Sequence, residues 1–240
     1  KRYTAIAVYE ETDVPMQEDN GHYLGIDMGL KNTLACYDSA GKTFLLNGLL
    51  NTTHYFDKEI ARYQGISDRQ QSCCGIKYPK KTKQVLSLYR KKKNKVSDLI
   101  HKTTRYVAEY CQAEHITTVV IGDMKGIRKG KDLGRINQQL HSFPYEKILQ
   151  KLEYKLKRYG IRMIRQKENY SSRCSPKSDK VGKAFAQSQN RKYRGLYIDE
   201  PDIYNADCVG AYNILRLYLQ KNKLPFPEAA GLNCPQKVFV

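Results

Sequence analysis

Two aspartates, one near each end of the chain, are the residues whose type and setting could do chemistry. Asp27 follows the apolar run of residues 23–26, and Gly29 comes two residues later, where the chain can turn sharply. A carboxylate buried at such a position costs several kcal/mol unless a cation or a hydrogen-bond donor satisfies it. Asp207 stands in the first turn of a helical segment, where the helix dipole favours a negative charge. Taken alone, Asp27 is equally typical of a surface residue at a strand end, and the second carboxylate favours the functional interpretation.

The elements that must position these aspartates follow from the hydrophobic pattern. After the first strand, residues 33–37 and 43–46 form two more predicted strands, joined by a turn at residues 38–41. The pattern then predicts helices at 54–69 and 82–112, a strand at 116–121, a helix from Pro144 to about 158, a strand at 161–167 and a helix at 205–219. Three strands followed by helix, strand, helix, strand and helix is the order of an RNase H-like α/β domain.

The bulk composition points to a polyanionic partner. Lysine and arginine number 42 against 24 aspartates and glutamates, a net charge of +18. Such an excess favours contacts with phosphate groups, although a merely soluble basic protein is the alternative. The seven cysteines show no paired framework, which favours a reducing, cytoplasmic setting. No apolar run approaches the length of a membrane span, so no membrane partner is expected.

The beginning of the sequence suggests a piece of a longer protein. The first residue is Lys1 rather than methionine, and residues 3–9 are typical of the last strand of a preceding module. We therefore expect an N-terminal portion of the same protein before this chain.

Three segments, in order along the chain, resemble the RuvC motifs of the TnpB (OrfB) family. This family of transposon-encoded nucleases is related to the type V CRISPR effectors and to Fanzor. The segments are Gly25-Ile26-Asp27-Met28-Gly29 with Asn32, then residues 119–127 (Val-Val-Ile-Gly-Asp-Met-Lys-Gly-Ile), and residues 205–215 (Asn-Ala-Asp-Cys-Val-Gly-Ala-Tyr-Asn-Ile-Leu). Residues 135–141 and 152–155 match the family too, and the resemblance covers about residues 3–240. Each motif alone is weak, whereas their order and spacing together are specific.

The resemblance implies an RNA-guided DNA endonuclease that takes part in transposition and DNA recombination. Its partners would be a guide RNA transcribed from the element, the target DNA and the N-terminal recognition half of the same protein. Two Mg²⁺ ions, with Mn²⁺ as a possible substitute, would activate a water and stabilise the leaving oxygen of the phosphodiester. Asp27 and Asp207 would supply two of the ligands. Two alternatives stay open: a catalytically silent, RNA-guided DNA-binding repressor, and an unguided, structure-specific RNase H-like nuclease.

The third acid departs from the commonest pattern of the family. That pattern has glutamate where this chain has Gly122, directly before Asp123. Side chains alternate along a strand, so Asp123 would point away from the face that residue 122 occupies. Some relatives resemble this chain in having a glutamate about 45 residues later, and Glu168, at the end of the next strand, fits that position. We therefore predict Glu168 rather than Asp123 as the third catalytic and metal-binding residue, with an ordinary surface glutamate as the alternative.

A zinc ribbon of the family is incomplete here. The family usually inserts four cysteines between its second and third motifs. This chain keeps Cys174, but Lys177 stands where the partner cysteine belongs, and Asp199 and Asp202 stand at the second pair. An ammonium group cannot ligate zinc, and one thiolate cannot complete a tetrahedral site. We therefore predict a ribbon loop without zinc, held by packing or mobile.

The resemblance also implies a division of the chain. Residues 1–20 would end a preceding wedge-like β module, 21–168 would form the RuvC core with a helical insertion at about 54–112, 169–204 the ribbon insertion, 205–220 the last RuvC helix and 221–240 a tail. The predicted nucleic-acid-binding residues are Lys31, Asn32, Lys125, Arg128, Lys129, Lys131, Arg135, Asn137 and Arg173.

Overall fold

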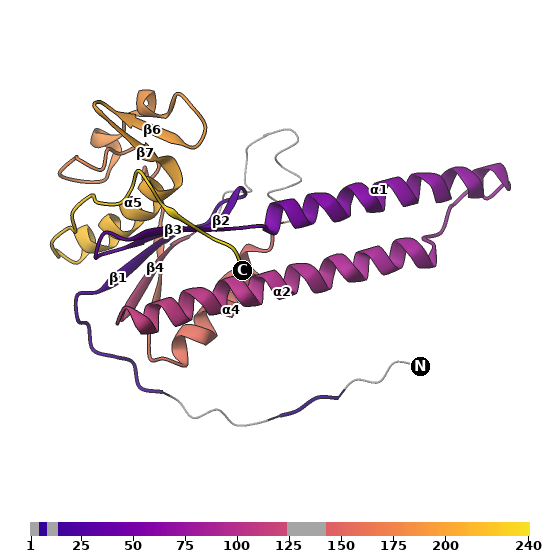
Figure 1. Cartoon of the computed structure of the whole chain (residues 1–240), viewed down its shortest axis with the longest axis horizontal. Helices are drawn as coiled ribbons and strands as arrows, with labels where there is room; N and C mark the ends of the chain where they lie inside the picture. The colour runs from indigo at the N-terminus through magenta and orange to yellow at the C-terminus, as the bar shows by residue number, and fades with distance from the viewer. Residues whose placement is uncertain (1–4, 9–13, 124–142) are drawn as a thin grey trace.

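A six-stranded mixed sheet forms the centre of the computed structural model, which describes residues 5–8, 14–123 and 143–240 (Figure 1). The strands are β1 (Tyr23–Asp27), β2 (Asn32–Asp38), β3 (Thr43–Asn47), β4 (Thr118–Asp123), β5 (Arg162–Lys167) and β8 (Gln236–Val238). They lie in the order β5-β4-β1-β2-β3-β8. The first three are antiparallel neighbours, β4 is parallel to β1, and β5 is parallel to β4. The strand β1 therefore lies inside the sheet, with β4 and β2 on its two sides.

Alternating side chains of the central strands enter two separate cores. In β1, Leu24 and Ile26 pack with the helices of one face, whereas Tyr23 packs with the helix of the other. In β4, Ile121 belongs to the first core and Val120 to the second. The two-residue period of a strand thus assigns each position to a face.

Four α-helices of the described residues complete the fold. Helices α2 (Lys83–Ala113) and α4 (Tyr145–Lys157) cover one face of the sheet, and α5 (Ala206–Lys221) covers the other. Helices α1 (Leu49–Cys73) and α2 form a long hairpin that extends well beyond the sheet (Figure 1). A small core of Ile60, Val85 and Leu88 joins the two helices of this hairpin.

An irregular insertion lies between β5 and α5. It contains two short 3₁₀ helices, η1 (Lys183–Phe185) and η2 (Ser188–Arg191), and a hairpin of β6 (Leu196–Asp199) with β7 (Asp202–Asn205). In Figure 1 this insertion lies beside α5, on the side of the sheet away from α2. No helix in the described part of the chain is both long and apolar enough to cross a membrane.

The predicted helices and strands of the core are confirmed, with shifts at their ends. Helix α1 begins five residues before the predicted start because Gly48, with a φ of 105°, turns the chain into it. The strand predicted at residues 3–9 is not present at residues 5–8, and its other positions lie outside the described residues. The strands β6, β7 and β8 were not predicted, because each has only three or four residues.

Candidate active site

Helix α5 lies so close to β1 that only glycine fits between them. A Cβ atom on Gly25 would lie 2.9 Å from Leu215 Cβ, and closer still to the carbonyl oxygen of Ala211. Such distances are below normal van der Waals contact, so a side chain at residue 25 would push the helix away. This close approach fixes α5 over the strand that ends in Asp27.

A second glycine, on the helix itself, makes room for the Asp27 carboxylate. A Cβ atom on Gly210 would lie 3.2 Å from Asp27 Cγ, and closer to Oδ2. The carboxylate therefore occupies the place that a side chain on α5 would otherwise fill. The sequence pattern contained both glycines, but their roles depend on the packing of α5 against the sheet.

Asp207 is held at the start of α5 by two asparagines. The side chain of Asn205 caps the helix by accepting hydrogen bonds from the backbone N–H groups of Asp207 (3.1 Å) and Cys208 (3.2 Å). The Nδ2 atom of Asn32 donates to Asp207 Oδ2 over 2.7 Å. Asn32 thus has a partner inside the protein, and its predicted contact with nucleic acid stays a prediction.

The side chain of Glu168, the residue directly after β5, occupies the space that Gly122 leaves open. A Cβ atom on Gly122 would lie 2.5 Å from Glu168 Cδ and 2.8 Å from Cγ, and closer still to Oε1. The oxygen Oε1 is buried and accepts no hydrogen bond within the described residues. A glutamate reaching in from the neighbouring strand has taken the position over β4 where residue 122 would place its own side chain.

Asp123 lies on the other side of the strand from Gly122. Val120 packs with α5 and Ile121 with the opposite core, so alternation places Gly122 on the α5 face and Asp123 on the opposite one. In the register of β4 with β5, Asp123 pairs with Lys167. This geometry is the one expected if Glu168 is the third acid, and that assignment itself stays a prediction.

The three predicted acids influence one another electrostatically. Burial raises the pKa of Asp27 well above its usual range, and the nearby charges of Glu168 and Asp207 raise it further. Burial, with a contribution from the charge of Asp123, raises the pKa of Glu168 to about 7. The charges of Glu168 and Asp207 therefore act on the buried Asp27 in one acidic region.

A cation of the protein that the sequence analysis missed also reaches this region. Arg191, at the end of η2, is near enough for its charge to lower the pKa of Asp27. Its Nη1 atom donates to the carbonyl oxygen of Ser172 over 3.5 Å. No periodic pattern marks Arg191, because it belongs to the irregular insertion.

The carboxylates converge without forming a finished metal cage. Among the residues that the structure describes, no group of three or more His, Cys, Asp or Glu side chains is arranged to hold a metal ion. The oxygen donors and the unpartnered Glu168 Oε1 nevertheless suit Mg²⁺, which binds through one or two carboxylates and keeps several waters.

The other predicted nucleic-acid contacts divide into two groups. Lys31 and Arg173 are exposed, and no phosphate-binding role is tested for either of them. The remaining residues of this prediction lie outside the described residues: Lys125, Arg128, Lys129, Lys131, Arg135 and Asn137.

Hydrogen bonds and an ion pair link three of the four positions of the predicted ribbon, Lys177, Asp199 and Asp202. The Lys177 ammonium lies 2.7 Å from Asp202 Oδ2, and it also donates to the carbonyl oxygen of Asp199. The Ser175 hydroxyl donates to Asp199 Oδ2 over 2.5 Å. Cys174 is buried, and its sulfur accepts a hydrogen bond from the backbone N–H of Gly182 over 3.4 Å. The absence of zinc stays a prediction, and these contacts show what else connects the two halves of the insertion.

Side chains of helix α5 also form hydrogen bonds with the backbone of the insertion. The Asn213 amide donates to the carbonyl oxygens of Ser171 and Cys174, each over 2.8 Å. Arg216, 1% exposed, donates to the carbonyl oxygens of Ser175 and Ser178. The helix that carries Asp207 is thereby joined to the insertion that carries Arg191.

Comparison with known proteins places this chain in a family. Residues 6–128 match the model of the OrfB/IS605 family, described as a probable transposase, and residues 145–214 match a Cas12f1-like TNB domain. The chain is therefore a member of a transposon-associated class of proteins. It belongs to the OrfB family, the TnpB family that its motifs resemble, and the sequence-based recognition is confirmed.

Two curated relatives have similar sequences over most of this chain. It is 25% identical over 206 residues to the CRISPR-associated endodeoxyribonuclease Cas12f1 of an uncultured archaeon, covering 83% of this chain and 38% of that protein. It is 24% identical over 196 residues to the TnpB-like protein ORF457 of Acidianus two-tailed virus, covering 80% and 40%. The chain thus spans about two fifths of the length of these relatives.

Solved structures share the fold. The Cas12f1 chain of a cryo-EM complex with sgRNA and target DNA aligns with a TM-score of 0.61 at 22% identity, covering 87% of this chain and 52% of that one. A CRISPR-Cas12f ternary complex aligns with a TM-score of 0.60 at 19% identity, covering 86% and 40%. The mixed α/β fold is therefore that of the corresponding part of Cas12f1.

Proposed function

We propose that this chain carries the nuclease centre of an RNA-guided, Mg²⁺-dependent DNA endonuclease of the TnpB type. The observation that carries the proposal is Glu168 in the space beside Gly122, on the same face of the sheet as Asp27 and Asp207. Without Glu168, the loss of the usual glutamate at residue 122 would favour a catalytically silent protein. With it, the charges of Glu168 and Asp207 both act on Asp27, which supports a phosphodiester-cleaving site built on these three carboxylates.

Each carboxylate has a separate support, which suits a preorganised site. Gly210 leaves room for Asp27, Asn32 and the cap of α5 orient Asp207, and Gly122 admits Glu168. Bound divalent ions would supply an activated water and neutralise charge on the leaving oxygen. Burial, followed by the charges of Glu168 and Asp207, raises the pKa of Asp27, and a bound cation would favour its ionised form, so the electrostatics of the site support this function.

The strand order supports an RNase H-like assignment of the fold. An antiparallel β1-β2-β3 unit is extended by the parallel strands β4 and β5, and the carboxylates lie on β1, after β5 and on the last helix. The ion pair of Lys177 with Asp202 supports an insertion that needs no zinc.

The partners follow from charge and from the relatives. The net charge of +18 suits a protein that binds phosphate backbones, and the solved Cas12f1 neighbour holds sgRNA and target DNA. We therefore propose a guide RNA and a target DNA as the partners of this chain as well.

Substitution of one acid at a time tests the proposal. The intact protein with its guide RNA and Mg²⁺ would be assayed for DNA cleavage as Glu168→Gln and, as the matched control, Asp123→Asn. Both changes keep the side-chain volume and remove one charge. We expect Glu168→Gln to lose about 10²-fold or more in rate, because a metal ligand and its charge are lost together, and Asp123→Asn to retain most activity.

The opposite results would assign the site differently. If Asp123→Asn is inactive and Glu168→Gln cuts normally, Asp123 is the third acid. If neither change matters while Asp27→Asn abolishes cutting, two protein carboxylates suffice. If the unmodified protein binds guide RNA and DNA but never cuts with Mg²⁺ or Mn²⁺, the silent, RNA-guided repressor becomes the function. Cutting that needs no guide would favour the unguided nuclease.

A further inference from the structure

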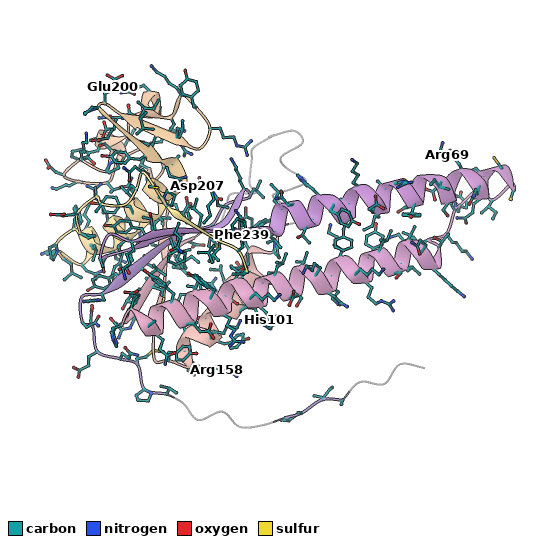
Figure 2. All side chains as sticks on the ribbon, in the orientation of Figure 1. Arg69, His101, Arg158, Glu200, Asp207 and Phe239 are labelled. Atoms are coloured by element: carbon teal, nitrogen blue, oxygen red, sulfur yellow. The ribbon has the colours of Figure 1, made fainter. Side chains whose placement is uncertain are left out.

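A basic pocket lies between α2 and α4, on the face of the sheet opposite the carboxylates. Its volume is about 380 Å³, and its charged or titratable lining residues are Lys92, Lys93, His101, Lys147 and Lys151. Among the described residues, no aspartate or glutamate lines it. Figure 2 shows His101 on α2 and Asp207 at the start of α5, on elements that cover opposite faces.

Helix α4 carries its acidic and its basic side chains on different sides, and two of its lysines line this pocket. Its acids Glu146 and Glu153 both pair with Arg165 of β5, at 3.5 and 3.6 Å. Lys147, Lys151 and Lys155 follow one another at intervals of four residues, so they share the other side of the helix. Like charges at this spacing repel one another. The acids of α4 are therefore turned away from its lysine row.

Two of these lysines have no anionic partner in the described residues. Lys155 is engaged inside the protein, where its ammonium donates to the carbonyl oxygen of His101 and to Thr104 Oγ1. Lys92 forms an ion pair with Asp57 at 2.5 Å. Among the described residues, no carboxylate lies within ion-pair distance of Lys147 or Lys151. The Lys151 ammonium lies over the ring of Tyr154, which is a cation–π contact.

The electrostatic effects of this crowding agree with the geometry. Burial lowers the pKa of Lys155, and the charges of Lys151, Arg105 and Arg158 lower it further. Burial, followed by the charges of Lys151 and Lys155, also lowers the pKa of His101. A bound anion would relieve this repulsion.

We propose that Lys147 and Lys151 bind the phosphodiester backbone of RNA in the pocket between α2 and α4. Lysine ammonium groups are compact point charges that suit phosphate oxygens and read no sequence. The DNA strand to be cut must approach Asp27 on the α5 face, so we assign the site on the opposite face to the RNA partner of the proposed function. The choice of RNA rests on the proposed function, whereas the binding of phosphate rests on the pocket alone.

Binding is measured without cleavage, in intact protein that carries Asp27→Asn. The probes are a fluorescent RNA duplex and a DNA duplex of the same sequence, titrated at several salt concentrations. The pocket variant is Lys147→Gln with Lys151→Gln. The matched control is Lys221→Gln with Lys237→Gln, which removes the same charge from two exposed lysines outside the pocket.

For RNA we expect the pocket variant to bind more weakly than the control and to lose about two units from its log–log salt slope, because two phosphate contacts are gone. Its melting temperature should equal or exceed that of the control, since removal of like charges does not harm the fold. DNA affinity should fall equally in both variants.

Three results would overturn the inference. Equal losses of RNA affinity in the two variants would show that only net charge matters. An equal additional loss for RNA and DNA duplexes would show a general backbone site instead of an RNA site. A pocket variant that melts several degrees below the control would assign these lysines to the fold. None of these readings depends on whether the protein cuts DNA, so failure of the nuclease proposal would be seen separately.

Discussion

The two faces of the central sheet differ in both charge and closeness of packing. On the α5 face, Gly25 and Gly210 allow backbone and carboxylate to approach within van der Waals distance, and acidic side chains gather there. On the face covered by α2 and α4, ordinary apolar side chains separate helix from strand, and the outer surface carries lysines.

The difference shows how one sheet can serve two purposes. The acidic face tolerates almost no change of volume, because Asp27 and Glu168 each occupy space that a glycine leaves open. The basic face places its charges at the solvent side of the helices, where side-chain length and flexibility matter less. We therefore expect substitutions on the α5 face to act through geometry and substitutions on the other face to act through charge.

The largest expected effect comes from moving the third acid between strands. Gly122→Glu alone should lose about 10²-fold or more in cleavage rate, because a second carboxylate enters the space that Glu168 fills. Glu168→Ala alone should lose a similar amount. Together, Gly122→Glu and Glu168→Ala should recover at least about tenfold over either single variant, since one acid again occupies the one available space.

Cleavage rates of the parent and the three variants, measured at the same Mg²⁺ concentration, form a complete double-mutant cycle. Strictly additive losses would show that residues 122 and 168 do not supply the same ligand position, and the acidic face would then need another third acid.

A smaller change tests the closeness of packing itself. Gly210→Ala should destabilise the protein by about 1–3 kcal/mol and reduce cleavage, because its methyl group would collide with the Asp27 carboxylate. Gly65→Ala in α1 is the control, since a Cβ atom there meets nothing within 4 Å. That change should stabilise the helix by about 0.5–1 kcal/mol. Urea unfolding would measure both, and equal effects of the two substitutions would contradict the contrast.

Arg191 provides a test of charge on the acidic face. We expect Arg191→Gln to reduce the cleavage rate about tenfold while the melting temperature is unchanged, since the side chain acts on the carboxylates from outside the ligand set. Arg194→Gln, an exposed neighbour in the same insertion, should cut like the parent. Equal rates for the two variants would mean that the charge of Arg191 has no part in the reaction.

The smallest effect is expected at the four ribbon positions. Asp202→Asn should leave the melting temperature almost unchanged, because the Lys177–Asp202 pair is half exposed to solvent, where an ion pair stabilises little. A zinc chelator should leave the melting temperature unchanged. Stoichiometric release of zinc, with a lower melting temperature, would show that a metal still closes the insertion.

Much of the acidic site could be predicted because its parts are local in the sequence. Asp27 follows an apolar strand, and Asp207 begins an apolar helix after a capping asparagine. The preference for Glu168 over Asp123 combined the family resemblance with the two-residue period of β4. The structure places Glu168 in the space beside Gly122, and its role as the third acid stays a prediction.

Other parts depended on contacts between distant segments. Nothing in the pattern around Asn32 indicates that its amide would meet Asp207, 175 residues later. Arg191 and the pair of Lys177 with Asp202 lie in an insertion with almost no periodic structure. The interactions of such a segment are set by the helix and loops against which it folds.

The sequence by itself determined the alternation of side chains along the strands, the apolar faces of the helices and the membership in the family, because each depends on the spacing of residues along the chain. The tertiary structure decided which glycines are spacers, which glutamate fills the gap beside β4 and which lysines share a pocket. The physical reason is that these outcomes are matters of volume and charge between segments far apart in the chain, and close packing leaves room for only one side chain in each space.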